Sequence, residues 1–199
     1  MSLVIFAIAL VAYFFIHSLL ADDRAKLFLT EKLVPPKHYR LIYNLLSLVL
    51  LAPLVWMFFI LKKQTLLDNP WYALPGGMLL IGGGIWVVQA LRGYDLKEFT
   101  GLGQLNGNPQ TAPPPLKTNG LNRFVRHPLY FGTLLMAWGF FILLPVDAAL
   151  LVAILTTVYL IIGCLLEERK LVQKYGMAYI TYRQKVPMLF PFRLRRRKF

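Results

Sequence analysis

The sequence predicts an all-α integral membrane protein with about five transmembrane helices, and three observations lead to this fold class. The 199 residues are 57% hydrophobic with a mean hydropathy of +0.56, which is too apolar for an ordinary soluble domain. The apolar residues form runs whose lengths approach the roughly 20 residues that cross a bilayer. The basic residues behind the net charge of +13 lie between these runs and in the tail, where they indicate topology and lipid contact rather than nucleic-acid binding.

Five apolar runs are the expected spans of a single membrane domain. They cover residues 2–21, 41–61, 71–91, 129–144 and 148–166. The last two runs are joined at Pro145-Val146-Asp147, and we expect them to form a tight hairpin in which the shorter helix crosses at a tilt or incompletely. Three consecutive glycines, residues 82–84, favour close approach of a neighbouring helix over a bend in the third run.

The polar segments of the chain are a long loop and a tail. Residues 92–128 lose the apolar pattern and contain a run of three prolines, so we expect a loop laid against the membrane or the helices. Residues 167–199 begin as a continuation of the last span and become amphipathic, with Leu171, Tyr175 and Tyr179 on one face at i, i+4 spacing. We expect an interfacial helix there, followed by a basic tail.

The distribution of charge predicts the orientation. Of the 22 lysines and arginines, 20 lie in the first loop, the third loop and the tail. The positive-inside rule makes this side cytoplasmic. We therefore expect the amino terminus outside and the long loop, the tail and any active site on the cytoplasmic face, in the inner membrane if the source is bacterial.

A polar group stands where the long loop meets the fourth run, at Arg126-His127-Pro128-x-Tyr130-x-Gly132. The expected hairpin brings Glu167 and Glu168 back beside it, and adjacent carboxylates at a membrane boundary are costly unless they are paired or solvated. Two interpretations remain open, a structural ion pair with an interfacial belt of tyrosines, or a ligand site. The lone Cys164 lies in an apolar run, which gives neither an internal disulfide nor a thiolate cluster, so no metal site is expected.

The spacing of these residues resembles the carboxy-terminal half of the integral membrane methyltransferases. The similarity runs from Arg126-His127-Pro128-x-Tyr130-x-Gly132 across about 35 residues to Glu167-Glu168, and on to Val186-Pro187. This superfamily includes isoprenylcysteine carboxyl, phospholipid and methanethiol S-methyltransferases. Upstream, the segments around His17-Ser18, Arg40-Leu41-Ile42-Tyr43-Asn44 and residues 95–104 resemble the methanethiol branch and its denitrification-associated relatives.

The resemblance implies an S-adenosylmethionine-dependent enzyme that methylates a small or lipid-dissolved thiol-like acceptor. A carboxylate acceptor is less expected, because Gly163-Cys164-Leu165-Leu166 stands where the carboxyl methyltransferases have an arginine. The implied cofactor-binding residues lie at the cytoplasmic ends of the last spans. They are Leu116, Lys117, Gly120, Arg126, His127, Tyr130, Glu167, Glu168 and Tyr182. Asn122 departs from the aromatic residue that the carboxyl methyltransferases usually have at that position.

The acceptor and the base that removes its proton are expected near two histidines. His127 is the nearest candidate base and His17 a second. Candidate residues of the acceptor pocket are His17, Ser18, Tyr43, Asn44, Asp95 and Gln104. An intramembrane histidine also has a structural interpretation, in which it hydrogen-bonds a neighbouring helix.

Two other functions remain open. The denitrification-associated relatives resemble a carotenoid isomerase that uses haem, for which His17 or His127 would be an axial ligand. A non-catalytic scaffold would instead use the basic residues 193–198 to bind anionic lipid. The expected partners are membrane lipid and a small-molecule or lipid methyl acceptor, and the sequence does not encode an oligomeric state.

Overall fold

The computed structural model describes residues 2–105 and 115–191, and the secondary structure there is helical apart from one antiparallel bridge between Thr65 and Val146. Four helices in these ranges are long and apolar enough to cross a membrane: α1 (Leu3–Ala21), α3 (Pro36–Ile60), α4 with the preceding turn η1 (Pro70–Leu91), and α8 (Asp147–Tyr175). A fifth apolar helix, α7 (Pro128–Leu143), has 16 residues. The all-α membrane fold is confirmed. That all five helices cross the bilayer stays a prediction.

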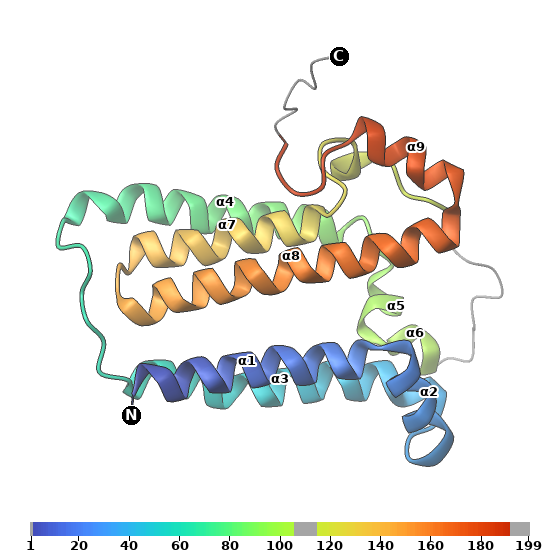
Figure 1. The fold of residues 1–199 in the computed structure, drawn as a ribbon, viewed down its shortest axis with the longest axis horizontal. Helices are drawn as coiled ribbons and strands as arrows, with labels where there is room; N and C mark the ends of the chain where they lie inside the picture. Colours follow the sequence, from blue (N-terminus) through green and yellow to red (C-terminus); the bar gives the residue numbers. More distant parts are fainter. Residues whose placement is uncertain (1, 106–114, 192–199) are drawn as a thin grey trace.

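The long helices form two layers (Figure 1). Antiparallel α1 and α3 make one layer, and α4, α7 and α8 make the other. The short helix α2 (Asp23–Lys32) follows α1, and it lies at the same end of the molecule as α9 (Met177–Lys185) and the start of α7. The amino terminus lies at the opposite end, where α1 begins. The polar segments of the chain thus gather mainly at one end of the bundle.

Helices α4 (Ala73–Leu91) and α7 pack closely through glycines. A Cβ atom on Gly83 would lie 2.8 Å from the carbonyl oxygen of Gly132, and one on Gly139 would lie 2.5 Å from the backbone nitrogen of Leu80. Gly82 and Gly84 have no other part of the structure within 4 Å of a Cβ. Of the three consecutive glycines, only Gly83 therefore provides the close helix contact that the sequence favoured.

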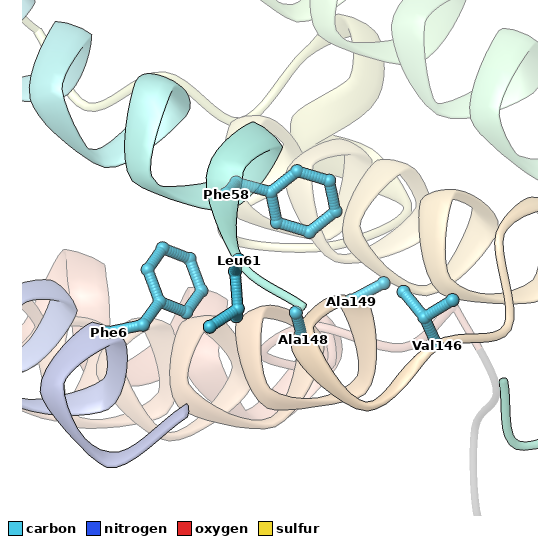
Figure 2. Close-up of a cluster of buried hydrophobic side chains, with 6 residues drawn as sticks. All are labelled: Phe6, Phe58, Leu61, Val146, Ala148 and Ala149. Carbon is cyan, nitrogen blue, oxygen red and sulfur yellow. The ribbon is translucent and has the colours of Figure 1, made fainter. Parts of the chain in front are cut away.

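The two layers are joined near the amino-terminal end by a buried apolar cluster (Figure 2). Its buried members are Phe6, Phe58, Leu61, Val146, Ala148 and Ala149. Ala148 and Ala149 are fully buried, and their small side chains let the first turn of α8 approach α1 and the end of α3. Asp147 adds a polar link, because its carboxylate accepts hydrogen bonds from the backbone nitrogens of Gln64 and Ala148. These contacts hold the outer ends of the layers together.

The described part of the segment expected as a long loop contains three short helices. These are α5 (Leu96–Thr100), α6 (Leu102–Leu105) and the 3-10 turn η2 (Gly120–Arg123). Gly101 joins α5 to α6 with φ of +92°, and a Cβ there would lie 2.5 Å from the backbone nitrogen of Leu41, so the corner sits directly against α3. Residues 106–114, which include two of the three prolines, lie outside the described residues.

The carboxy-terminal segment differs from a single amphipathic helix. Helix α8 continues nine residues past position 166 to Tyr175, and Gly176, with φ of +56°, ends it. Helix α9 then turns back over the start of α7 (Figure 1). Tyr175 and Tyr179 consequently lie on different helices, because the left-handed glycine breaks the i, i+4 pattern between them. The basic residues 193–198 lie outside the described residues.

Candidate active site

Arg126 and Glu168 form a buried ion pair between the start of α7 and the last turns of α8. Arg126 Nε donates to Glu168 Oε1 at 2.6 Å, Nη2 contacts the same oxygen, and both side chains are 9% exposed. Arg126 Nη1 donates to the carbonyl oxygens of Arg183 and Val186. Each guanidinium nitrogen therefore has a partner inside the protein, and the side chain ties α8 to the end of α9.

The chain after α9 lies across the entrance to α7. The backbone nitrogens of Arg126 and His127 donate to the carbonyl oxygens of Pro187 and Met188, at 2.9 and 3.2 Å. The next residue, Leu189, is buried in an apolar cluster with Cys164 and its neighbours on α7 and α8. This pairing is a tertiary contact between segments about 60 residues apart, and it covers the polar group from one side.

His127 lies between two carboxylates. Its Nδ1 is 3.5 Å from Glu167 Oε2, and its Nε2 is 3.4 Å from Glu168 Oε1, although the geometry at Nε2 does not make a hydrogen bond. The imidazole stacks on the ring of Tyr130, with centroids 5.5 Å apart and an interplanar angle of 9°. Burial works to lower the pKa of His127, but Glu167 and Glu168 outweigh it and raise the pKa above its ordinary value.

The local sequence fixes where His127 points. Pro128 occupies the first position of α7, where its missing N–H costs nothing, and His127 is the residue that precedes the helix. A proline also disfavours helical backbone in the residue before it. His127 accordingly has a non-helical backbone, with φ of −118° and ψ of 70°, and its side chain reaches Glu167 on α8.

Two residues of α9 and η2 complete the polar group. Tyr182 Oη donates to the carbonyl oxygen of Asn122, and Asn122 Nδ2 donates to the carbonyl oxygen of Arg126 at 3.2 Å. Tyr179 is 1% exposed, and its hydroxyl is buried without a hydrogen-bond partner in the described structure. Asn122, where the sequence departs from the carboxyl methyltransferases, thus anchors the loop that leads into α7.

The remaining predicted cofactor residues lie on the loop before α7. Lys117 is exposed, and its Nζ lies 5.7 Å from the centre of the Tyr94 ring. Burial, and then the charge of Glu167, raise the pKa of Tyr94. Leu116 is half-buried and Gly120 is exposed with φ of +59°. The structure thus places Lys117 beside Tyr94, and within the described residues it shows no direct contact of Leu116 or Gly120 with the ion pair.

A second polar cluster lies between α1 and α3. His17 Nε2 is 2.9 Å from Tyr43 Oη, and His17 Nδ1 is 3.0 Å from Ser47 Oγ. On the same helix as His17, Ser18 Oγ donates to Tyr159 Oη of α8 at 3.1 Å. Three predicted acceptor residues, His17, Ser18 and Tyr43, therefore lie together, and the structure adds Ser47 and Tyr159.

The other predicted acceptor residues have structural partners. Asn44 Nδ2 donates to the carbonyl oxygens of Phe99 and Thr100, which fixes α5 on α3. Asp95 caps α5 by accepting from the backbone nitrogens of Lys97 and Glu98. Gln104 Nε2 lies 3.5 Å from the carbonyl oxygen of Glu98, while its Oε1 is buried without a hydrogen-bond partner in the described structure. Asn44, Asp95 and Gln104 therefore hold the loop in place, whereas His17 belongs to the cluster between α1 and α3.

Sequence reasoning missed three residues of these clusters, Ser47, Tyr94 and Tyr159, and named Asn122 only as a departure from the carboxyl methyltransferases. Ser47 and Tyr159 had a usable signal. Each is a polar residue inside an apolar run. Ser47 follows Tyr43 by four positions, so Tyr43 and Ser47 lie on one face of the same helix. Tyr94 and Asn122 are loop residues with no periodic pattern, and only the fold places them.

Fold and site together define an all-helical membrane protein with a buried cation–carboxylate cluster at one end of its helices and aromatic side chains around it. Comparison with known proteins gives the particular family. The family model described as phospholipid methyltransferase matches residues 72–178, which include α4, α7, His127 and both glutamates. The chain belongs to this family of methyltransferases.

Named relatives also match the chain, one of them over nearly its whole length. Methanethiol S-methyltransferase 1 of Bradyrhizobium diazoefficiens is 32% identical over 197 residues, which cover 96% of this chain and 67% of that protein. The methanethiol S-methyltransferase of Crocosphaera subtropica is 35% identical over 54% of this chain and 43% of its own length. That of a Pseudomonas species is 45% identical over 40% of this chain and 30% of its own length. No solved structure matches the chain significantly.

Proposed function

We propose that this protein transfers a methyl group from S-adenosylmethionine to a small or membrane-dissolved thiol. The observation that carries the proposal is the placement of His127 between Glu167 and Glu168, inside the segment that matches the methyltransferase family. The names of the relatives support a thiol as the acceptor, with methanethiol as the first compound to test. S-adenosylmethionine supplies a methyl group on a positively charged sulfur, and its displacement needs alignment and exclusion of water.

The residues present fit a ligand that carries an ammonium, a sulfonium and a carboxylate. Glu167 has a side chain that is 45% exposed, so its carboxylate is accessible to a cationic ligand, whereas Glu168 is held by Arg126. The buried Nε2 of His127 and the buried hydroxyl of Tyr179 lack hydrogen-bond partners within the described residues. Unpaired polar atoms of this kind are costly unless a ligand or water completes them.

Arg126 takes a different role from the one that the resemblance implies. Because its nitrogens are paired with Glu168 and two carbonyl oxygens, we propose that Arg126 positions Glu168 and the chain after α9. The exposed amine of Lys117, beside the Tyr94 ring, is then the cation for the cofactor's carboxylate. The rings of Tyr94 and Tyr130 are aromatic faces for adenine or for the sulfonium.

The acceptor side of the reaction is assigned to His17, Ser18 and Tyr43. Tyr159 connects this cluster to the cofactor side, since it contacts Ser18 and packs in the same apolar cluster as Tyr130. We further propose that the polar end of the bundle faces the cytoplasm, because the loops with most of the basic residues lie there. Methyl donor made in the cytosol would then reach the site directly.

The structure supports haem binding by this protein less than it supports methyl transfer. Both ring nitrogens of His17 lie within hydrogen-bonding distance of Tyr43 or Ser47, and both ring nitrogens of His127 face carboxylates. An axial ligand needs a free nitrogen lone pair directed at the iron. The named relatives are methyltransferases, which also makes a purely structural scaffold the weaker interpretation.

The test is a pair of measurements on the purified protein in detergent. Calorimetric titration with S-adenosylhomocysteine is expected to show binding, and incubation with methyl-labelled S-adenosylmethionine is expected to label methanethiol in preference to phosphatidylethanolamine. A Soret band after supplementation with haem, together with no binding of S-adenosylhomocysteine, would overturn the proposal. Transfer to the phospholipid alone would overturn the assignment of the acceptor.

A further inference from the structure

Three side chains on α1 and α3 form a hydrogen-bonded chain inside the bundle. His17 Nδ1 lies 3.0 Å from Ser47 Oγ, and His17 Nε2 lies 2.9 Å from Tyr43 Oη, which is further from Nδ1 at 3.4 Å. Ser47 Oγ donates to the carbonyl oxygen of Tyr43, one turn earlier on α3, at 2.8 Å. All three side chains belong to half-buried residues. Because one link ends on a carbonyl oxygen, which can only accept, the protons of the other links can be assigned from it.

The carbonyl oxygen of Tyr43 sets the direction of the chain. A carbonyl only accepts, so the single hydroxyl proton of Ser47 points at it. Ser47 Oγ then accepts from His17, which places the ring proton on Nδ1. A neutral imidazole has no second proton, so His17 Nε2 is an acceptor and takes the hydroxyl proton of Tyr43. The lone pairs of Tyr43 Oη remain available to accept a proton from outside the chain.

We infer that Tyr43 is the residue that contacts the acceptor thiol and relays its proton to His17, with Ser47 as the positioning residue that holds His17 in the receptive tautomer. The identity of the acceptor rests on the proposed function. The tautomer rests on the hydrogen bonds alone.

The proton and electron balance of the step is simple. The S–H bond of the thiol breaks and its proton binds Tyr43 Oη, while the hydroxyl proton of Tyr43 moves to His17 Nε2. The electron pair of the S–H bond stays on sulfur and forms the new bond to the methyl carbon. The bond between that carbon and the sulfonium sulfur breaks, and its electron pair returns to the donor's sulfur, so the methylated acceptor and the spent donor both end as neutral thioethers. The resulting imidazolium donates from Nδ1 to Ser47 and from Nε2 to Tyr43, so both of its protons have acceptors.

The surroundings place this relay on the path to the cofactor side. On α1, the Tyr13 ring stacks on His17 with centroids 5.9 Å apart, and Phe14 stacks on Tyr159 of α8 at 4.3 Å. Tyr159 packs against the apolar cluster that also receives Tyr130. The titratable groups around His17 are phenols: Tyr13 and Tyr43 contact its ring, and Tyr159 hydrogen-bonds the next residue, Ser18.

The first experiment reads the tautomer without any catalysis. The chain has three histidines, so the full-length protein with nitrogen-15-labelled histidine gives a small set of ring signals, and those lost in His17→Asn belong to His17. We expect a protonated Nδ1 and an unprotonated Nε2. Ser47→Ala should give a mixture of tautomers, and Ser47→Thr, which keeps a hydroxyl, should restore the wild-type pattern.

A matched control is Thr30→Ala. Thr30 on α2 also donates its hydroxyl proton to the carbonyl oxygen four residues earlier, but its hydroxyl is not hydrogen-bonded to His17. Its removal should leave the His17 signals unchanged. A wild-type spectrum with the proton on Nε2, or a Ser47→Ala spectrum identical to wild type, would overturn the inference.

The second experiment measures methyl transfer to a thiol as a function of pH. General base catalysis contributes about 10²-fold or more, so Tyr43→Phe should lower kcat by about that factor near pH 7, and Ser47→Ala should lower kcat with little change in the KM for the thiol. Both losses should shrink as the pH approaches the pKa of the thiol, because a thiolate needs no base. An equal loss at every pH would contradict the relay. A wild-type protein that neither binds S-adenosylhomocysteine nor transfers methyl would instead refute the proposed function.

Discussion

Arg126 and Glu168, which are 42 residues apart in the chain, meet in an ion pair that is nine-tenths buried. The pair joins the residue before the α7 entrance to the last turns of α8, and its remaining donors hold the carbonyl oxygens of Arg183 and Val186. A charged pair of this kind contributes little net stability when complete, yet loss of one partner leaves an unpaired buried charge. Its chief consequence is the fixed position of the carboxylates around His127.

Replacement of Arg126 should therefore destabilise the protein strongly. Arg126→Gln leaves Glu168 buried without its cation, which we expect to cost about 3–5 kcal/mol of unfolding free energy. Arg40→Gln is the control, since the Arg40–Glu98 pair is exposed at 3.7 Å and should contribute about 1 kcal/mol or less. Denaturant unfolding followed by tryptophan fluorescence measures both.

The double variant Arg126→Met with Glu168→Leu separates stability from function. It removes both charges, so stability should return toward wild type while binding of S-adenosylhomocysteine does not. A double variant as unstable as Arg126→Gln would contradict the view that the unpaired charge is the cause.

The stability of the site should depend on pH through His127. Its pKa is raised in the folded protein, because Glu167 and Glu168 outweigh the effect of burial. The stabilisation is therefore fully present below the unfolded-state pKa of about 6.5 and is lost as the pH rises through the higher folded-state pKa. Thermal unfolding between about pH 5.5 and 8.5 should show a falling Tm in wild type. His127→Gln should remove most of this slope.

Glu167 and Glu168 should differ as variants, although they are adjacent. Glu167→Gln keeps the shape of a side chain that is 45% exposed, so we expect a folded protein that binds S-adenosylhomocysteine at least tenfold more weakly, a change of about 1.4 kcal/mol. Glu168→Gln leaves Arg126 without its anion and should lower the Tm as well. Calorimetric titration beside thermal unfolding distinguishes the two. Unchanged binding by Glu167→Gln would show that the carboxylate of Glu167 does not bind the ligand.

The glycines of α4 offer a test of helix packing. Gly83→Ala places a Cβ 2.8 Å from the Gly132 carbonyl oxygen on α7, so the helices must separate, and we expect a loss of about 1–3 kcal/mol. Gly82→Ala has open space and should be neutral or slightly stabilising, because alanine is the better helix former. The thermal unfolding of the two variants in detergent gives the comparison. Equal effects would show that close packing is not the reason for the glycines.

Local patterns were enough to predict the class of fold and the gathering of His127, Glu167 and Glu168 at one end of the helices. The apolar runs anticipated the five apolar helices α1, α3, α4, α7 and α8 to within a few residues at most of their ends, because helix length and burial in lipid both depend on nearby residues. The fourth apolar run was expected to begin at residue 129, one residue after the observed start of α7, and the order of the last two runs indicated that Glu167 and Glu168 would return to His127. The end of α8 was less accurate, since a polar helix can continue beyond the membrane until a glycine stops it.

What the sequence by itself determined is thus an all-helical membrane protein with His127, Arg126 and two glutamates gathered at one end of its helices. Only the tertiary structure decided how each side chain is used. It paired Arg126 with Glu168 and with carbonyl oxygens 57 and 60 residues away. Asn44 and Asp95 form hydrogen bonds with the backbone of the loop. His17 contacts Ser47 and Tyr43. Hydrogen bonds between distant segments depend on the packing of whole helices, and no periodic pattern along the chain records them.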